Sequence, residues 1–152
     1  MKWVARVLVI ALVIAAVFVQ SARGYRRRQL NTAERLLRRG EYSLALEAAE
    51  AADGWPVAAA PGRIDLLRGE AYEGLGDLAR AEASYLRAYR SDPENFWALA
   101  DLAEYYAAHA SSSAEGRRQT SEYVEELRRR FSNNKALPRV LDRVERSMSR
   151  TR

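Results

Sequence analysis

The sequence contains no cysteine, one histidine and only four prolines among its 152 residues. Without cysteine, the chain forms no disulfide, thiolate metal site or redox dithiol and has no cysteine nucleophile, and its redox compartment stays open. A single histidine, His109, also excludes histidine-rich metal sites. Few prolines together with 48% hydrophobic residues argue against disorder and for a buried core.

Signals for β-strands are scarce as well. Isoleucine and threonine are few, while alanine, leucine, arginine and glutamate dominate. No stretch after residue 22 alternates apolar and polar side chains. Both observations favour helix over sheet. We therefore predict an all-α protein, and the length is about that of one domain.

Catalytic patterns are also missing from the sequence. Ser111–Ser113 is a serine run without a neighbouring base, and His109 has no second histidine for relay or metal work. We expect His109 at a helix end, either exposed or in contact with the helix dipole. Gly74 and Gly76 imitate part of a dinucleotide fingerprint, but they follow a predicted helix rather than a strand. We predict that the protein is not an enzyme and uses no cofactor or metal.

Charge is distributed unevenly along the chain. Residues 1–28 hold six bases and no acid, residues 29–116 hold 8 bases and 15 acids, and residues 117–152 hold 11 bases and 5 acids. A nucleic-acid-binding protein gathers its basic residues on one folded surface, whereas the first basic cluster here flanks an apolar run. We do not expect nucleic acid as a partner. The basic C-terminal region is most simply a solvated face, with a membrane headgroup or an acidic partner as the alternative.

An apolar segment begins near the N-terminus. Val7–Val19 is a run of thirteen apolar residues, and residues 3–5 extend it to seventeen positions interrupted only by Arg6. As a helix this segment would rise roughly 26 Å, against a hydrocarbon core of about 30 Å, and Arg6 can reach the interface. We predict that residues 1–24 are a transmembrane anchor and that residues 3–22 contact the bilayer.

A cleaved signal peptide is the alternative. The segment has a basic start and small residues at Ser21, Ala22 and Gly24, but Gln20 would occupy the minus-three position for cleavage after Ala22. Arginines then follow, which disfavours cleavage. The basic residues on the two flanks nearly balance. Their slight excess after residue 22 favours a cytoplasmic body, with a periplasmic or other extracytoplasmic body as the alternative.

The chain also contains an internal repeat of about 36 residues. Gly40-Glu-Tyr42-Ser-Leu-Ala45 matches Gly76-Asp-Leu78-Ala-Arg-Ala81. The second copy has a fuller pattern, with Gly69, Tyr72, Gly76, Ala81, Tyr85, Ala88 and Pro93 at offsets 0, 3, 7, 12, 16, 19 and 24. These residues resemble the tetratricopeptide repeat, a unit of two antiparallel helices.

The offsets have physical causes. Small residues at Gly69 and Ala81 let paired helices approach closely, and we expect Tyr72 and Tyr85 to fill the space between them, mostly buried. Gly76 permits the left-handed turn that joins the two helices. The resemblance covers residues 26–134, in copies that span residues 26–59, 62–95 and 96–134.

The copies differ in quality. The first lacks the usual tryptophan and leucine, and the third is stretched by about five residues between Ser111 and Gly116. Residues 135–152 predict a basic amphipathic capping helix and tail. The predicted architecture is therefore a transmembrane helix, a helical-hairpin solenoid of about three repeats, and a C-terminal capping helix.

The resemblance implies a binding groove, because these repeats usually hold extended peptides or helices against the first helix of each pair. In this chain the groove positions would be Arg27, Arg63 and Trp97 in one row, Glu34, Glu70 and Glu104 in another, and Glu73 nearby. The glutamates would suit a basic or amide-rich ligand, and Trp97 a large anchor. A solvated glutamate row is the alternative. Some members clamp a terminal carboxylate with lysine and asparagine, where this chain has Leu30 and Glu34, so we do not expect that clamp.

The implied function is a membrane-anchored scaffold that presents the groove to a partner protein and tethers it at the bilayer. Two alternatives stay open. The chain is a permanent accessory subunit of a larger membrane complex, or it is an exported soluble repeat protein released by cleavage. The sequence indicates neither the partner's identity nor the oligomeric state.

Overall fold

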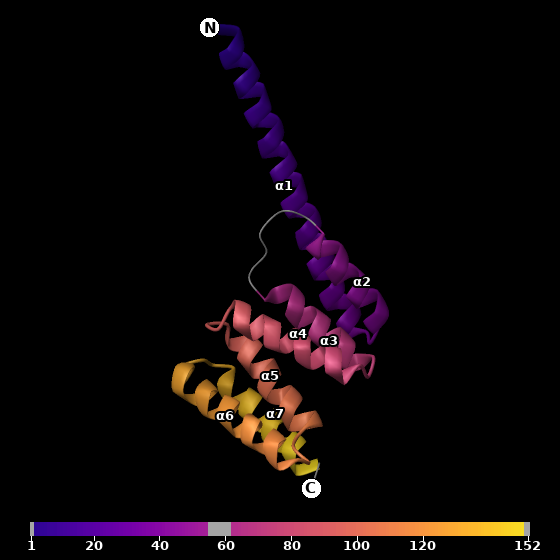
Figure 1. Ribbon diagram of the computed structural model, residues 1–152, viewed down its shortest axis with the longest axis vertical. Coiled ribbons are helices and arrows are strands. Elements are labelled where there is room, and N and C mark those ends of the chain that lie inside the picture. The colour runs from indigo at the N-terminus through magenta and orange to yellow at the C-terminus, as the bar shows by residue number, and fades with distance from the viewer. Residues whose placement is uncertain (1, 55–61, 151–152) are drawn as a thin grey trace.

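The computed structural model describes residues 2–54 and 62–150, and every regular element in these ranges is an α-helix. Most helices pack against the next helix in sequence, and α7 lies mainly on α5 (Figure 1). The predicted all-helical class is confirmed. The helices are α1 (Lys2–Arg38), α2 (Tyr42–Asp53), α3 (Arg63–Gly74), α4 (Leu78–Ser91), α5 (Phe96–His109), α6 (Ala114–Arg130) and α7 (Leu137–Arg150).

Some predictions fall outside the described part of the chain. They concern the side chains of Lys2 and Arg6, which bear on membrane orientation, residues 55–59 at the end of the first predicted copy, and residues 151–152 of the tail.

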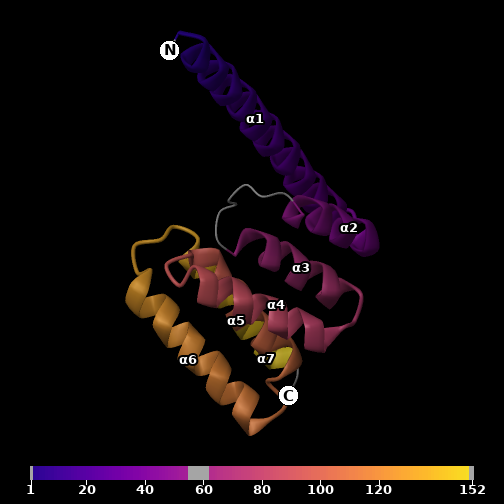
Figure 2. The ribbon, with the colours of Figure 1, turned by 45° about the horizontal axis from the view of Figure 1, so that its top comes forward.

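Helix α1 is a single helix of 37 residues, roughly 55 Å long. Its first half stands away from the other helices in both views (Figures 1 and 2), and large apolar side chains such as Leu12 and Ile14 are 69% and 64% exposed. This helix is long and apolar enough to cross a membrane. It continues without a break past Gly24, so the predicted anchor and the first predicted repeat helix form one continuous helix.

Two glycines turn the chain between paired helices. Gly40 and Gly76 have φ angles of 74° and 78°, in the left-handed region that favours glycine. The next amide in each turn closes the preceding helix in the same way: Glu41 donates to the carbonyl of Leu36 at 3.0 Å, and Asp77 to that of Tyr72 at 2.9 Å. The same C-terminal motif therefore ends α1 and α3 and returns the chain along α2 and α4.

Small residues line the packed faces of these helices. Ala45 and Ala81, five residues after the two glycines, are both fully buried. Because an alanine face adds little bulk, the helix axes approach closely. The first core cluster contains Leu30 and Ala33 of α1, Ala48, Ala49 and Ala52 of α2, and Ile64 and Leu67 of α3.

The predicted packing residues of the second copy lie around Tyr85, which is only 2% exposed. Gly69 and Ala88 are buried with it, and Pro93 lies in the turn after α4. A Cβ atom placed on Gly69 would lie 2.5 Å from Cε1 of Tyr85, so the ring occupies the space that a larger residue would need. Tyr72 differs from the prediction, because it is only half-buried and lies beneath the guanidinium of Arg80.

The third turn is shorter than predicted. Helix α6 already begins at Ala114, because the Ser113 hydroxyl accepts a hydrogen bond from the Gly116 amide at 2.9 Å and caps the helix. Gly116 therefore lies in the first helical turn rather than in a loop. There it packs so tightly on Ala110 that a Cβ atom would lie 1.9 Å from the Ala110 carbonyl oxygen.

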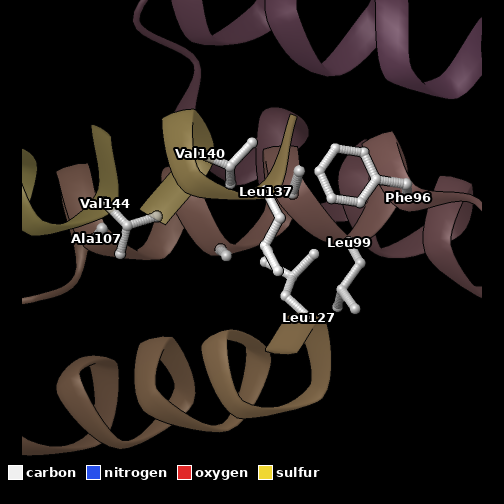
Figure 3. Close-up of a cluster of buried hydrophobic side chains, with 9 residues drawn as sticks. Phe96, Leu99, Ala107, Leu127, Leu137, Val140 and Val144 are labelled. Carbon is white, nitrogen blue, oxygen red and sulfur yellow. The ribbon is translucent and has the colours of Figure 1, made fainter. Parts of the chain in front are cut away.

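Helix α7 completes the C-terminal core (Figure 3). Val140 and Val144, one turn apart, are fully buried together with Leu99 of α5 and Leu127 of α6. Their four-residue spacing gives α7 one apolar face, while its arginines lie on the other faces. The expected amphipathic helix is therefore present, from Leu137 to Arg150.

Gly69→Ala should lower the free energy of unfolding by about 1 to 3 kcal/mol, because the new methyl group would clash with a ring that is buried and hydrogen-bonded to Glu73. A loss of 1 kcal/mol lowers the melting temperature by about 2 to 4 °C in a domain of about 150 residues. Thermal unfolding in detergent, followed by circular dichroism, measures the change. Gly24→Ala is the control, since its new methyl group would meet no atom of another described segment within 4 Å. Equal melting temperatures for both variants would contradict the packing argument.

Candidate functional site

Two adjoining cavities run across the first helices of the three helix pairs. The first has a volume of about 560 Å³ and is lined by Glu34, Leu37, Arg38, Arg63, Leu66, Leu67, Glu70, Asn95, Trp97 and Asp101. The second, about 420 Å³, is lined by Glu70, Glu73, Tyr85, Asp101, Glu104, Tyr105, Ala108 and Ser147. Because Glu70 and Asp101 line both, the cavities form one continuous depression. We call it the acidic groove.

Six of the seven residues predicted for a binding groove line this depression. Glu34, Arg63, Glu70 and Trp97 line the first cavity, and Glu73 and Glu104 line the second. Arg27 does not belong with them. It is exposed on α1 and lines neither cavity.

Two of the three glutamates in the predicted row already have arginine partners. Arg63 donates to Glu34 across the gap between α1 and α3. Arg143 of α7 donates from Nε and Nη2 to the two oxygens of Glu104, at 2.8 and 2.5 Å. Such a bidentate arginine–carboxylate pair holds the carboxylate of Glu104 in one orientation. Both glutamates are therefore already engaged by arginines of the chain itself.

Glu73 is held by neutral and titratable partners. Its carboxylate accepts a hydrogen bond from the Tyr85 hydroxyl at 2.7 Å, and its other oxygen lies 2.8 Å from Nε2 of His109. The imidazole also lies against the Tyr105 ring, with 5.1 Å between centroids. His109 is exposed at the end of α5, as predicted, and it is also a side-chain partner of a groove residue, which was not predicted. Only the fold brings residues 73 and 109 together.

Glu70 and Asp101 remain, and no hydrogen bond or ion pair joins either carboxyl group to another side chain in the described part of the chain. Burial raises the pKa of Glu70, and the carboxylates of Glu73, Glu34 and Glu104 raise it further. Burial also raises the pKa of Asp101 well above its ordinary value, with Glu70 and Glu104 adding to the effect and Arg143 opposing it. Both carboxyl groups therefore lack a positive neighbour close enough to offset their burial.

Sequence reasoning missed Asp101. It lies one turn after Trp97 on α5, so helical spacing from the predicted tryptophan contained the signal. Trp97 itself is 51% exposed, with its ring edge-to-face on Phe96 at 5.0 Å. An exposed indole near two carboxyl groups suits a cationic side chain, which both can attract.

A metal ion is a poorer fit than an organic cation. Among the described residues, no three metal-binding side chains gather closely enough to hold an ion. An arginine or lysine side chain needs only the carboxyl pair and an apolar wall for its stem.

No protein-family model, curated protein or solved structure matches this chain. The side chains of the acidic groove form a row of acids in which the two ends carry internal arginines and the middle does not.

Asp101→Asn should raise the melting temperature at pH 7 to 8. The folded-state pKa of Asp101 lies above the unfolded value of about 3.9, so the folded state binds the proton more tightly. The free energy of unfolding therefore falls as the pH rises from the unfolded pKa through the folded pKa. The advantage of the variant should shrink on acidification and vanish near pH 4.

Asp142→Asn is the matched control for this measurement. Its carboxylate is exposed and pairs with Arg146 one turn away, so its removal should cost at most about 0.5 kcal/mol and give no gain. Thermal unfolding at several pH values measures both variants. A lower melting temperature for Asp101→Asn at neutral pH would show that the carboxylate is well compensated.

Proposed function

We propose that the protein is a membrane-anchored scaffold of the tetratricopeptide type that presents its acidic groove to a basic segment of a partner protein. The anchor is the apolar half of α1. The groove is lined by α1, α3 and α5, with α7 at one end. No chemistry is needed for this role, since the scaffold acts by raising the local concentration of its partner at the bilayer.

Repeated local geometry supports the tetratricopeptide part of the proposal. Gly40 and Gly76 adopt the same left-handed conformation, and the residue five positions after each is a fully buried alanine. A second glycine–tyrosine contact joins neighbouring pairs, because a Cβ atom on Gly74 of α3 would clash with the ring of Tyr42 of α2. Repeated turns and repeated close contacts are what stacked copies of one unit require.

The two carboxyl groups of Glu70 and Asp101 have no ion-pair partner among the described residues, and the proposed ligand is inferred from them. On either side of them, arginines of the chain itself neutralise Glu34 and Glu104. We infer that the partner supplies the missing cation as an arginine or lysine side chain. Trp97, half-exposed in the same cavity, gives that side chain and its neighbours an apolar surface.

The continuous helix α1 gives this scaffold a fixed relation to the membrane. Because the same helix carries the apolar segment and the groove residue Glu34, the groove cannot swing freely on a linker. The proposal puts the groove on the cytoplasmic side, since more arginines follow the apolar segment than precede it.

The anchor part predicts that the full chain stays in the membrane fraction after carbonate washing and needs detergent for release. The uninterrupted apolar helix is the reason, since burying its side chains in hydrocarbon is strongly favourable. A version that lacks residues 1–22 is the control and should be released. Recovery of a mature chain that begins beyond residue 20 would support the exported alternative instead.

The groove part predicts that peptides selected from a random displayed library on the full chain in nanodiscs share one arginine or lysine. Glu70→Gln with Asp101→Asn should weaken their binding about tenfold or more, because the partner's cation then loses both carboxylates. The matched control, Glu47→Gln with Glu125→Gln, changes the same net charge at exposed positions outside the groove and should bind normally.

Trp97→Ala separates the two claims within this prediction. If Trp97→Ala weakens peptide binding but the double carboxyl variant does not, peptides bind in the groove but not through a cationic side chain. Selected peptides that tolerate both changes would refute the groove itself.

A further inference from the structure

Arg26 is a buried arginine in the seam between α1 and α2. The neighbouring positions of α1 on this face, Ala22, Leu30 and Ala33, are all buried, and Arg26 itself is only 8% exposed. Its Nε atom is shielded from solvent and has no hydrogen-bond partner. A buried Nε–H without an acceptor is unfavourable, and a largely buried positive charge without a counterion adds to the cost, so an anion that reaches the terminal nitrogens of Arg26 would stabilise this position.

The nearby acidic group does not supply it. Because α1 and α2 run antiparallel from the turn at Gly40, Arg26 lies level with the end of α2 near Gly54. Asp53 is the carboxylate at that end, and it instead accepts a hydrogen bond from Arg68 of α3 at 3.0 Å. The C-terminus of α2 contributes only a partial negative charge of about one half. Among the described residues, no carboxylate forms an ion pair with Arg26.

The position of Arg26 along α1 suggests where the anion comes from. It lies seven residues after Val19, the last residue of the apolar run, which corresponds to roughly 10 Å along the helix. The headgroup layer of a bilayer begins where the hydrocarbon ends and is about 5 to 8 Å thick. Side chains of a helix lean towards its N-terminus, so a long arginine on α1 reaches back towards the membrane.

Two further arginines lie within one turn of this position. Arg23 and Arg27 are both exposed, and each is offset by less than a third of a turn from the buried face of α1. Figures 1 and 2 show α1 continuing alone beyond the end of α2, and the antiparallel run of the two helices from Gly40 puts Arg23 and Arg27 near that level. The end of α2 and the three arginines therefore form a basic corner at the base of the membrane helix.

We propose that Arg26, with Arg23 and Arg27 beside it, binds the phosphate of an anionic phospholipid headgroup at the junction of α1 and α2. The lipid phosphate supplies the counterion that the described residues do not, and the two exposed arginines give it further donors. This inference rests on the proposed membrane anchor and is independent of the acidic groove. Its consequence is that the junction between membrane helix and folded body becomes firmer when anionic lipid is present.

Native mass spectrometry of the detergent-solubilised full chain tests the proposal directly. The protein is mixed with equal amounts of phosphatidylglycerol and phosphatidylcholine, and the retained lipid is counted. Arg28→Gln is the matched control. Arg28 is exposed on the opposite side of α1, and its substitution removes the same charge as Arg26→Gln. Loss of one arginine's diffuse attraction to anionic lipid should lower the retention of phosphatidylglycerol about fivefold in either variant. Arg26→Gln should lower the retention of phosphatidylglycerol by about a further tenfold, because it also removes the specific site.

A second measurement guards against simple misfolding. Arg26→Met fills the same seam without a charge, so in nanodiscs of phosphatidylcholine alone it should melt no lower than the wild type. Replacing about a third of the lipid with phosphatidylglycerol should raise the melting temperature of the wild type and of Arg28→Gln, but not that of Arg26→Met. Equal responses of all three proteins would overturn the proposal.

Inorganic phosphate distinguishes a lipid site from a site for free anions. In lipid-free detergent, phosphate and chloride are compared at equal ionic strength. Stabilisation of the wild type by phosphate alone, as large as that given by phosphatidylglycerol, would assign the site to a soluble anion and overturn the lipid proposal. Failure of the anchor is separately visible, because a chain released by carbonate washing lacks the membrane placement that this inference requires.

Discussion

Gly69 has no side chain at the point where the ring of Tyr85 crosses from α4 to α3, and this single close contact sets how near the two helices lie. The same solution is used between Gly74 and Tyr42, and alanines fill the remaining seam positions. Once these spacings are fixed, the outward faces of α1, α3 and α5 follow in order, and the residues on them form one groove. The acidic groove is therefore a product of small residues that lie behind it.

The groove distributes charge in a way that stability alone does not explain. Arginines 29 and 39 residues away in sequence neutralise Glu34 and Glu104, and a tyrosine and a histidine hold Glu73. Asp101 is half-buried and Glu70 lies at the more open part of the groove, both without such help, and their raised pKa values express the cost. Uncompensated charge in a depression is typical of a site that a ligand completes. Arg26 is the corresponding case for a positive charge, since it is buried without an anionic partner among the described residues.

Helix α1 joins these two places. Its stretch after Val19 carries Arg26 near the expected membrane surface and Glu34 in the groove, only eight residues apart. A flexible linker between an anchor and a binding domain would separate the two events. In the proposed membrane-bound state, a continuous helix would instead fix the distance and direction from bilayer to groove, so a partner held in the groove would lie at a defined height above the lipid.

Much of the fold was accessible from the sequence because its signals are local. Alanine-rich composition predicts helix, Gly40 and Gly76 mark turns that need a left-handed residue, and an apolar run of thirteen residues marks the long exposed half of α1. The resemblance to the tetratricopeptide repeat, read across three aligned copies, also pointed to six of the residues that line the acidic groove. These features depend on interactions between residues only a few positions apart.

The electrostatic state of the site was decided only by the tertiary structure. Whether a glutamate is free or paired depends on arginines that the fold brings from distant helices, as Arg143 shows for Glu104. Whether a charged residue is buried depends on the packing of a neighbouring helix, as α2 shows for Arg26. The sequence by itself determined which residues are helical and which could share a face. The packing of those helices determined which charges are compensated, because Coulomb interactions and burial depend on distance in space rather than along the chain.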